Sequence, residues 1–244
     1  MGSAHEKIQT PCQDRFACVA MAEDATLVAV VADGAGSATH AHIGAELAVA
    51  SVSAIAQLGV RAGRRDYEQI LRDSAALARM KLVDTAHERK LALRELACTL
   101  LAVIVPPVGG AALQIGDGVI VLRELRDPWR WVFWPQKGEY ANATYFLTDE
   151  SALAEARVAV LPNEVQDIAL TSDGLEALAL HYASRTAHEP FFRTAFAAVH
   201  AAKQDGELAA LSASLSDFLR SPVVRARTDD DASLILATRR GRAP

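Results

Sequence analysis

The 244-residue sequence contains little cysteine, few aromatic residues and no large excess of charge of one sign. Its three cysteines, Cys12, Cys18 and Cys98, are odd in number and none forms a C-x-x-C pair, which argues against a disulfide framework and a cysteine zinc site. The formal net charge is -5, so electrostatics gives no reason to bind DNA or RNA. We therefore expect no nucleic-acid partner.

The sequence also shows no pattern typical of a secretory signal or of a membrane-spanning segment. Residues 1–10 carry polar and charged side chains without an apolar run behind them, unlike a signal peptide. No apolar stretch reaches the roughly 18 residues that would span a bilayer. We therefore expect a cytoplasmic protein with no membrane partner. The 51% of hydrophobic residues and 23% of charged residues are typical of a globular protein with a substantial core.

Hydrophobic periodicity predicts strands and helices that occur in blocks. We expect strands at 16–22, 26–32, 98–105, 111–115, 119–125, 129–134, 144–147, 158–161, 167–171 and 232–237, and helices at 42–58, 66–96, 175–182, 190–201 and 207–219. Blocks of this kind favour an α+β fold with antiparallel sheets over a doubly wound parallel sheet. We expect one domain over residues 1–244, with 239–244 as a flexible tail.

The second predicted helix carries a repeating apolar pattern. Ile70, Leu71, Leu77, Met80 and Val83 recur at spacings that suit one buried helix face. The sequence therefore predicts that these five side chains pack into the core.

Five aspartates lie in predicted turns beside apolar strands: Asp14, Asp33, Asp117, Asp173 and Asp230. Carboxylates at strand ends can meet at one edge of a sheet, and hard cations such as Mg²⁺ and Mn²⁺ prefer such oxygen ligands. A single Asp-Gly pair usually indicates only a turn, and the triplet 229–231 is either solvated or holds a cation. Taken together, these positions are moderate evidence for a metal site.

The order of short motifs is more specific. The motifs are Cys12-Gln13-Asp14, Val30-Val31-Ala32-Asp33-Gly34-Ala35-Gly36, Ala97-Cys98-Thr99-Leu100, Ile115-Gly116-Asp117-Gly118, Leu170-Thr171-Ser172-Asp173-Gly174-Leu175 and Asp229-Asp230-Asp231-Ala232-Ser233-Leu234. In this order the chain resembles the type-2C (PPM) family of metal-dependent Ser/Thr protein phosphatases, particularly its compact bacterial branch. The resemblance extends over nearly the whole chain.

The resemblance implies a four-layer α-β-β-α sandwich, in which two antiparallel sheets are flanked by helix pairs and a metal centre lies at one end. Position by position, Asp33 would bridge two Mn²⁺ or Mg²⁺ ions and the Gly34 carbonyl would bind one of them. Asp173 and Asp230 would complete the coordination of the other ion. Asp117, together with Asp173, would hold a third ion.

The implied reaction is hydrolysis of phosphoserine and phosphothreonine by a metal-bridged hydroxide, with Asp14, Asp33 and Asp173 as catalytic residues and Asp14 orienting metal-bound water. The implied partner is a phosphorylated protein, such as a Ser/Thr kinase or its target. Two alternatives stay open: a catalytically silent domain that binds a kinase or phosphoprotein, and a phosphohydrolase that acts on a small molecule.

The chain departs from the family pattern at several positions. Gln9 stands where many members have an arginine that grips the substrate phosphate, so His5 or Lys7 is the candidate replacement. Gln13 replaces a glutamate, and Asp231 replaces an asparagine. The segment 137–156 falls where the family carries a variable flap, and its shortness predicts an active site open to protein substrates.

Overall fold

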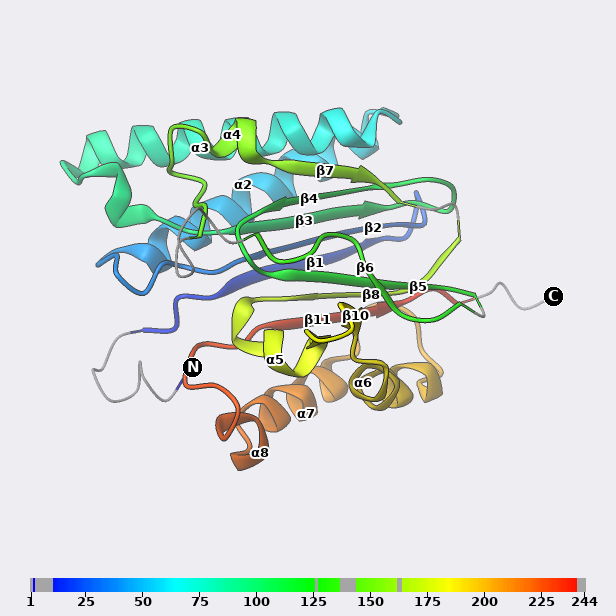
Figure 1. Cartoon of the computed structure of the whole chain (residues 1–244). Coiled ribbons are helices and arrows are strands. Elements are labelled where there is room, and N and C mark those ends of the chain that lie inside the picture. Colours follow the sequence, from blue (N-terminus) through cyan, green and yellow to red (C-terminus); the bar gives the residue numbers. More distant parts are fainter. Residues whose placement is uncertain (1, 3–10, 126, 137–143, 162–163, 241–244) are drawn as a thin grey trace.

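The computed structural model describes residues 2, 11–125, 127–136, 144–161 and 164–240. Two antiparallel sheets are stacked face to face, with one helical layer on the outer side of each sheet (Figure 1). This arrangement confirms the predicted α+β fold and the four-layer order.

The first sheet has the strand order β1-β2-β3-β4-β7, and the second has the order β11-β8-β5-β6. The strands of the first sheet are β1 (Arg15–Met21), β2 (Thr26–Ala32), β3 (Leu100–Val105), β4 (Ala111–Ile115) and β7 (Arg157–Val160). Those of the second sheet are β5 (Val119–Glu124), β6 (Arg130–Trp131), β8 (Val165–Thr171) and β11 (Leu234–Thr238). A short hairpin, β9 (Leu180–His181) and β10 (Thr186–Ala187), stands apart from both sheets.

The long helices follow the blocks that the sequence predicts, but the helix predicted at 175–182 is reduced to residues 176–179 and is followed by β9. The helices are α2 (Ala41–Arg61), α3 (Tyr67–Arg89), α4 (Ala152–Glu155), α5 (Glu176–Ala179), α6 (Glu189–Ala201), α7 (Ala209–Leu219) and α8 (Pro222–Arg225), with 3-10 turns at Leu93–Leu96 and Asp173–Leu175. In Figure 1, α2 and α3 cover the first sheet, whereas α6 and α7 lie below the second sheet.

Alternating side chains of the inner strands divide the core into layers. In β2, Val28 and Val30 face the helical layer formed by α2 and α3, whereas Ala29 and Val31 face the second sheet. Both sides of the strand are apolar because both of its faces are covered. The continuous apolar run that predicts a buried strand therefore describes β2 correctly.

Helix α2 has the length and hydropathy of a membrane span, with 21 residues and a mean hydropathy of 1.6, contrary to the expectation that no stretch is long and apolar enough. In this structure it is a core helix. Its small residues Ala45, Ala48 and Ala56 are fully buried in the layer that it forms with the first sheet and α3. Burial inside a protein explains an apolar helix as well as a bilayer does.

Two details of the α3 prediction are wrong. The helix ends at Arg89 rather than residue 96, because Lys90 takes a left-handed conformation with φ 55° and closes it. The buried face contains Ile70, Leu71, Ala75, Ala78 and Leu82, in which small residues allow close packing.

Three of the five apolar positions of α3 that the sequence assigns to the core lie on the opposite side. Leu77, Met80 and Val83 are 46%, 60% and 39% exposed. The predicted strand at 144–147 is also absent over residues 145–147, where the Leu147 N–H donates a single hydrogen bond to the Cys98 carbonyl.

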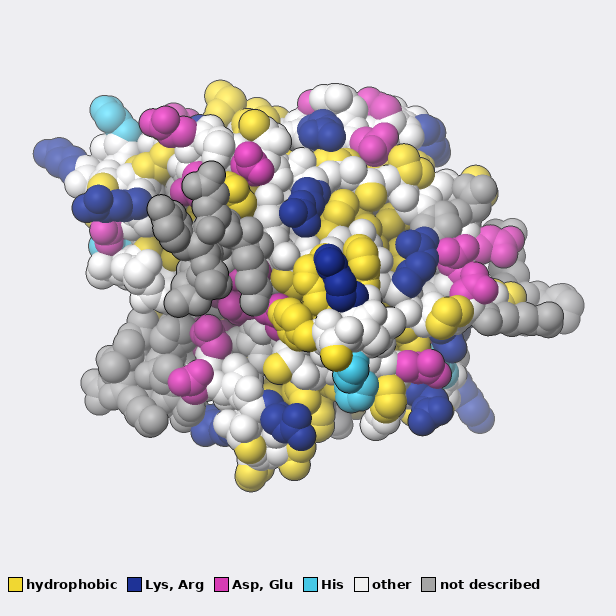
Figure 2. Space-filling view, viewed as in Figure 1, with side chains coloured by type: hydrophobic (Ala, Val, Ile, Leu, Met, Phe, Trp, Pro, Cys, Tyr) yellow, Lys and Arg dark blue, Asp and Glu magenta, His cyan; other side chains and the backbone are white. Residues whose placement is uncertain are grey.

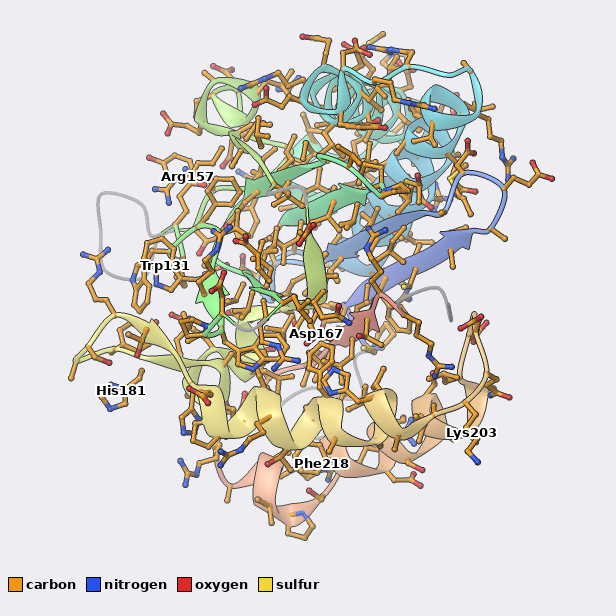
Figure 3. All side chains as sticks on the ribbon, turned by 90° about the vertical axis from the view of Figure 1, so that its right-hand side faces the viewer. Trp131, Arg157, Asp167, His181, Lys203 and Phe218 are labelled. Carbon is orange, nitrogen blue, oxygen red and sulfur yellow. The ribbon has the colours of Figure 1, made fainter. Side chains whose placement is uncertain are left out.

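A buried ionic cluster attaches α6 to the second sheet. Asp167 of β8 is completely buried, and it accepts hydrogen bonds from Arg123 of β5 at 2.7 Å and pairs with His200 of α6 at 2.8 Å. Figure 3 shows Asp167 between the sheet and the helical layer. The Arg123 guanidinium also lies over the Trp129 ring, whose neighbours are Phe192 and Phe196.

Candidate active site

The five predicted aspartates lie at one end of the sandwich because of the strand directions. Asp14 precedes β1, Asp33 follows β2, Asp117 lies between β4 and β5, Asp173 follows β8, and Asp230 precedes β11. Neighbouring antiparallel strands bring these starts and ends to the same side. Figure 2 shows acidic side chains gathered toward the left of the view, where this end of the sandwich lies.

The turn that carries Asp33 is held by the segment directly before β3. The Asp33 N–H donates to the Thr99 hydroxyl at 3.0 Å, and the Thr99 N–H donates back to the Asp33 carbonyl at 2.8 Å. The Ala35 N–H continues this pairing to the Ala97 carbonyl at 2.9 Å. These bonds explain why the motif 97–100 accompanies the Asp33 turn: it fixes the backbone from which the carboxylate projects.

Glycine is required at position 34 because neighbouring segments of the chain come very close to its backbone. A Cβ at this position would lie 2.8 Å from the Cβ of Ala41 and 3.0 Å from that of Gln13. The start of α2 and the segment before β1 therefore both press on the turn, and a side chain here would push Asp33 out of place.

Asp14 is buried, with 5% of its surface exposed, and it is anchored to the second sheet. Its Oδ2 accepts a 2.7 Å hydrogen bond from the Ser172 hydroxyl, whose oxygen accepts the Ser233 N–H at 3.0 Å. Ser172 thus links the segment before β1 to the ends of β8 and β11, next to Asp173.

The Asp117 turn is shaped by two glutamines. Gln114, which is fully buried, donates through Nε2 to the carbonyls of Gly116 and Gly118 at 2.8 and 3.0 Å. The Gln136 side chain accepts the Gly116 N–H at 3.4 Å. Asp117 itself accepts a hydrogen bond from the Thr144 hydroxyl through Oδ2. The turn therefore holds a half-buried carboxylate in a fixed direction.

Asp230 differs from the other four aspartates in being exposed. Its Oδ1 accepts the N–H of Asp231 at 2.8 Å, and its own N–H donates to the Thr228 hydroxyl at 3.2 Å. Its charge nevertheless acts on Asp173, so the two carboxylates belong to one electrostatic group.

Three of the aspartates form one electrostatic group. Burial, and then the charges of Asp14 and Asp173, raise the pKa of Asp33 well above its usual range. The structure thus brings these distant residues near one another, and their role in binding metal stays a prediction.

The neighbouring carboxyls are also harder to ionise than usual. Burial raises the pKa of Asp14. Burial, together with the charges of Asp117, Asp230 and Asp14, raises the pKa of Asp173 to about 7. Raised pKa values favour the protonated carboxyls, which reduces the mutual repulsion of the group.

The donor atoms fit a hard divalent cation. Asp14 Oδ1 and Asp173 Oδ1 are buried and have no hydrogen-bond partner, although an orphaned buried carboxylate oxygen is costly. Cations of this class bind such oxygens. Within the described ranges, however, no three His, Cys, Asp or Glu side chains already form a closed ligand set. Binding of a metal ion would therefore require side-chain movement.

His5 and Lys7, the candidates for gripping phosphate, lie outside the described residues, as do 137–143 of the predicted flap. Gln13, which replaces the family glutamate, is buried and donates through Nε2 to the Ala38 carbonyl at 3.4 Å. It therefore supports the Asp33 loop.

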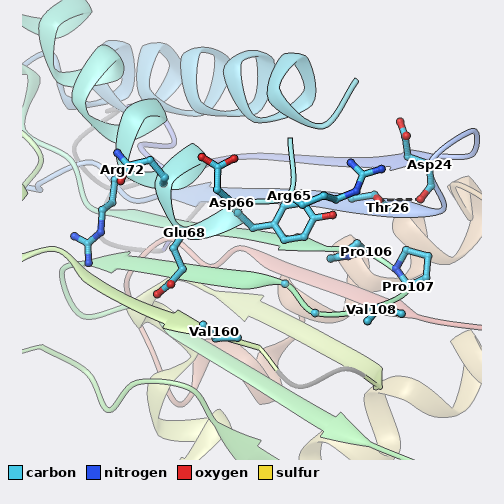
Figure 4. A pocket seen from close by; sticks show the side chains of 14 residues that line it. Asp24, Thr26, Arg65, Asp66, Glu68, Arg72, Pro106, Pro107, Val108 and Val160 are labelled. Carbon is cyan, nitrogen blue, oxygen red and sulfur yellow. Dashed lines mark hydrogen bonds between the residues drawn. The ribbon is translucent and has the colours of Figure 1, made fainter. Parts of the chain in front are cut away.

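A separate cleft lies at the other end of the molecule. Its volume is about 860 Å³, and it is bounded by Thr26 at the start of β2, Pro106 after β3 and Val160 at the end of β7 (Figure 4). Asp33 lies at the opposite end of β2, so this cleft is not part of the carboxylate group.

Sequence reasoning missed the supporting polar residues Thr99, Ser172 and Gln114. Thr99 and Ser172 stand inside quoted motifs, but nothing in their spacing distinguishes a supporting hydroxyl from an ordinary one. Gln114 lies in an apolar strand, where a lone buried polar residue was the available signal.

The sequence model of the family described as protein phosphatase 2C matches residues 1–220 of this chain. The chain belongs to the protein phosphatase 2C family. It is 37% identical over 243 residues to serine/threonine-protein phosphatase 3 of Escherichia coli strain K12, and the alignment covers 97% of this chain and 94% of that protein. As a 2C phosphatase the chain is a metal-dependent phosphoprotein phosphatase, and nothing favours the catalytically silent alternative.

Solved structures show the same fold. Stp1 from Staphylococcus aureus superposes with a TM-score of 0.63 at 13% identity, over 95% of this chain and 90% of that one. PppA from Pseudomonas aeruginosa gives a TM-score of 0.58 at 19% identity, over 92% and 96% of the two chains. At identities this low, the two superpositions show only that the folds are alike.

Proposed function

We propose that this 2C phosphatase hydrolyses phosphoserine and phosphothreonine in proteins at the Asp14–Asp33–Asp173 carboxyl group. The observation that carries the proposal is that Asp14, Asp33 and Asp173 gather at one end of the sandwich, where Asp14 Oδ1 and Asp173 Oδ1 are buried without a hydrogen-bond partner. So concentrated a negative charge has no structural benefit by itself, and it is suited to holding cations.

In this proposal each residue has a distinct task. Asp33 would hold two Mn²⁺ or Mg²⁺ ions and the Gly34 carbonyl would bind one of them. Asp173 and Asp230 would bind the other ion, and Asp117 would join Asp173 at a third. When bound, such ions lower the pKa of a water molecule and neutralise charge on the phosphoryl oxygens.

Asp14 has a supporting task. Its Oδ2 is occupied by the Ser172 hydroxyl, whereas its Oδ1 is orphaned toward the site. We assign it the orientation of the attacking water, for which a fixed and buried acceptor is required.

The partner that we propose is a phosphorylated Ser/Thr kinase or one of that kinase's targets, in the cytoplasm. The relative from Escherichia coli is named a serine/threonine-protein phosphatase, which supports this choice of phosphorylated residue. His5 and Lys7 remain our candidates for gripping the phosphate.

The proposal is tested with p-nitrophenyl phosphate and a phosphothreonine peptide, each with Mn²⁺ or Mg²⁺ and again with excess EDTA. We expect turnover of both substrates with metal and none with EDTA. Turnover of the small ester without any turnover of the peptide would instead support a phosphohydrolase of small molecules, and no turnover of either would support a silent domain.

A further inference from the structure

Asp231 connects segments that are far apart in the sequence. It is 1% exposed and lies where the chain enters β11, directly after Asp230. Its Oδ1 accepts the Gly2 N–H at 2.6 Å, and its Oδ2 accepts the Gln13 N–H at 2.7 Å. Both carboxylate oxygens therefore receive backbone donors from the segment that precedes β1.

These contacts connect two proposed site residues. Gln13 is the neighbour of Asp14, so its hydrogen bond to Asp231 fixes the backbone from which Asp14 points toward Asp33. On the other side, the Asp231 N–H donates to Oδ1 of Asp230 at 2.8 Å. One residue thus holds Asp14 and Asp230 relative to each other.

Two glycines show how closely the backbone of Asp230 and Asp231 is enclosed. A Cβ on Gly174 would lie 1.9 Å from the Asp231 carbonyl oxygen, and a Cβ on Gly2 would lie 2.3 Å from the Asp230 carbonyl carbon. Gly174 follows Asp173, so a third proposed site residue is also held against Asp231. Distances this short leave no room for a side chain at either glycine.

We propose that Asp231 is a positioning residue for the divalent-cation site, and that its carboxylate serves this role where an amide would not. A carboxylate accepts hydrogen bonds at both oxygens, whereas an asparagine of the same shape must direct its NH₂ group toward one of the two N–H donors. The aspartate that stands in place of the family's asparagine can therefore accept both donors, the N–H groups of Gly2 and Gln13. The inference rests on the proposed roles of Asp14, Asp173 and Asp230.

The test compares Asp231→Asn with Asp229→Asn. Asp229 is exposed and two positions away, so its substitution removes the same charge from the same loop without removing the two hydrogen bonds. Mn²⁺ binding is measured by equilibrium dialysis, alongside kcat and KM for p-nitrophenyl phosphate and the melting temperature.

We expect Asp231→Asn to weaken Mn²⁺ binding by about tenfold and to lower kcat, because a buried donor loses its acceptor. Asp229→Asn should leave both within about twofold of the wild type, the scatter usual for surface changes. Gly2→Ala disturbs the hydrogen bond between Gly2 and Asp231 at its donor, and it should also weaken Mn²⁺ binding.

Unchanged Mn²⁺ affinity and kcat in Asp231→Asn would overturn the proposal, even if the melting temperature falls, because that result describes a structural role only. If Asp231→Asn fails to fold, Gly2→Ala decides: unchanged Mn²⁺ affinity in that variant overturns the proposal. Failure of the proposed function itself looks different, because the wild type would then show no Mn²⁺-dependent turnover.

Discussion

The Ser172 hydroxyl donates a 2.7 Å hydrogen bond to Oδ2 of Asp14 across 158 positions of sequence. This contact fixes Asp14, which precedes β1, to the end of β8, next to Asp173. The site is therefore built by hydroxyls and amides that hold the carboxylates, as much as by the carboxylates themselves.

The first prediction concerns this contact. Ser172→Ala removes both the bond to Asp14 and the acceptor of the Ser233 N–H, so we expect a loss of about 1–3 kcal/mol in the free energy of unfolding and a lower kcat. Urea unfolding and steady-state kinetics measure the two effects. Ser212→Ala, an exposed change on α7, is the control. Equal behaviour of the two variants would show that Ser172 does not position Asp14.

The second prediction concerns pH in the absence of metal. The pKa of Asp173 is about 7 in the folded protein, against an ordinary value of 3.8. Between these values the folded state binds more protons than the unfolded state, so stability falls as pH rises through this window. We expect the melting temperature in EDTA to be several degrees lower at pH 8 than at pH 5, and Mn²⁺ to restore it at pH 8.

Asp173→Asn isolates this effect because it cannot ionise. In EDTA at pH 8 the variant should be more stable than the wild type, and its melting temperature should change less with pH. If wild type and variant lose the same number of degrees between pH 5 and pH 8, Asp173 is not the residue responsible.

The third prediction concerns the turn before Asp117. Gly116 has φ +100°, and a Cβ there would lie 2.6 Å from Cγ2 of Thr99, the residue that also holds the Asp33 turn. Gly116→Ala should cost at least about 1 kcal/mol of stability, since the backbone is unfavourable for alanine and the space is filled. Gly36→Ala, which meets no atom within 4 Å, is the stability control. Equal unfolding midpoints for the two variants would contradict this reading.

The fourth prediction separates stability from chemistry. Asp167 is completely buried between Arg123 and His200, so Asp167→Ala should destabilise the protein by about 3 kcal/mol, since a buried ion pair loses one partner. Because Asp167 lies at the far end of β8 from Asp173, kcat of the folded fraction should stay unchanged. A fall in kcat at unchanged unfolding midpoint would refute this assignment.

Much of the fold follows from the sequence because buried strands have a simple signature. The bounds of β2 and β4 match the predicted ranges, since each is a mostly apolar run that ends at a glycine-containing turn. The strand predicted at 129–134 shrinks to Arg130–Trp131, because Trp129 packs on Phe192 and Phe196 of α6. That contact joins residues more than sixty positions apart, and a local pattern does not contain it.

The candidate site was also only partly predictable from the sequence. The aspartates could be found because each follows or precedes an apolar strand, and the resemblance added their order. Which side of α3 is exposed could not be predicted from the sequence. The periodicity shows which residues share one side of the helix, but only the packing decides which side is buried. The donors to Asp231 were equally hidden, since Gly2 and Gln13 carry no side-chain signal for them.

The most direct test of the central claim is the number of Mn²⁺ ions bound per chain, measured by equilibrium dialysis for the wild type and for Asp33→Asn. The account predicts at least two ions per wild-type chain, and a loss of tight binding together with turnover in a variant that keeps its circular dichroism spectrum. Unchanged Mn²⁺ binding and phosphothreonine hydrolysis in Asp33→Asn would contradict it.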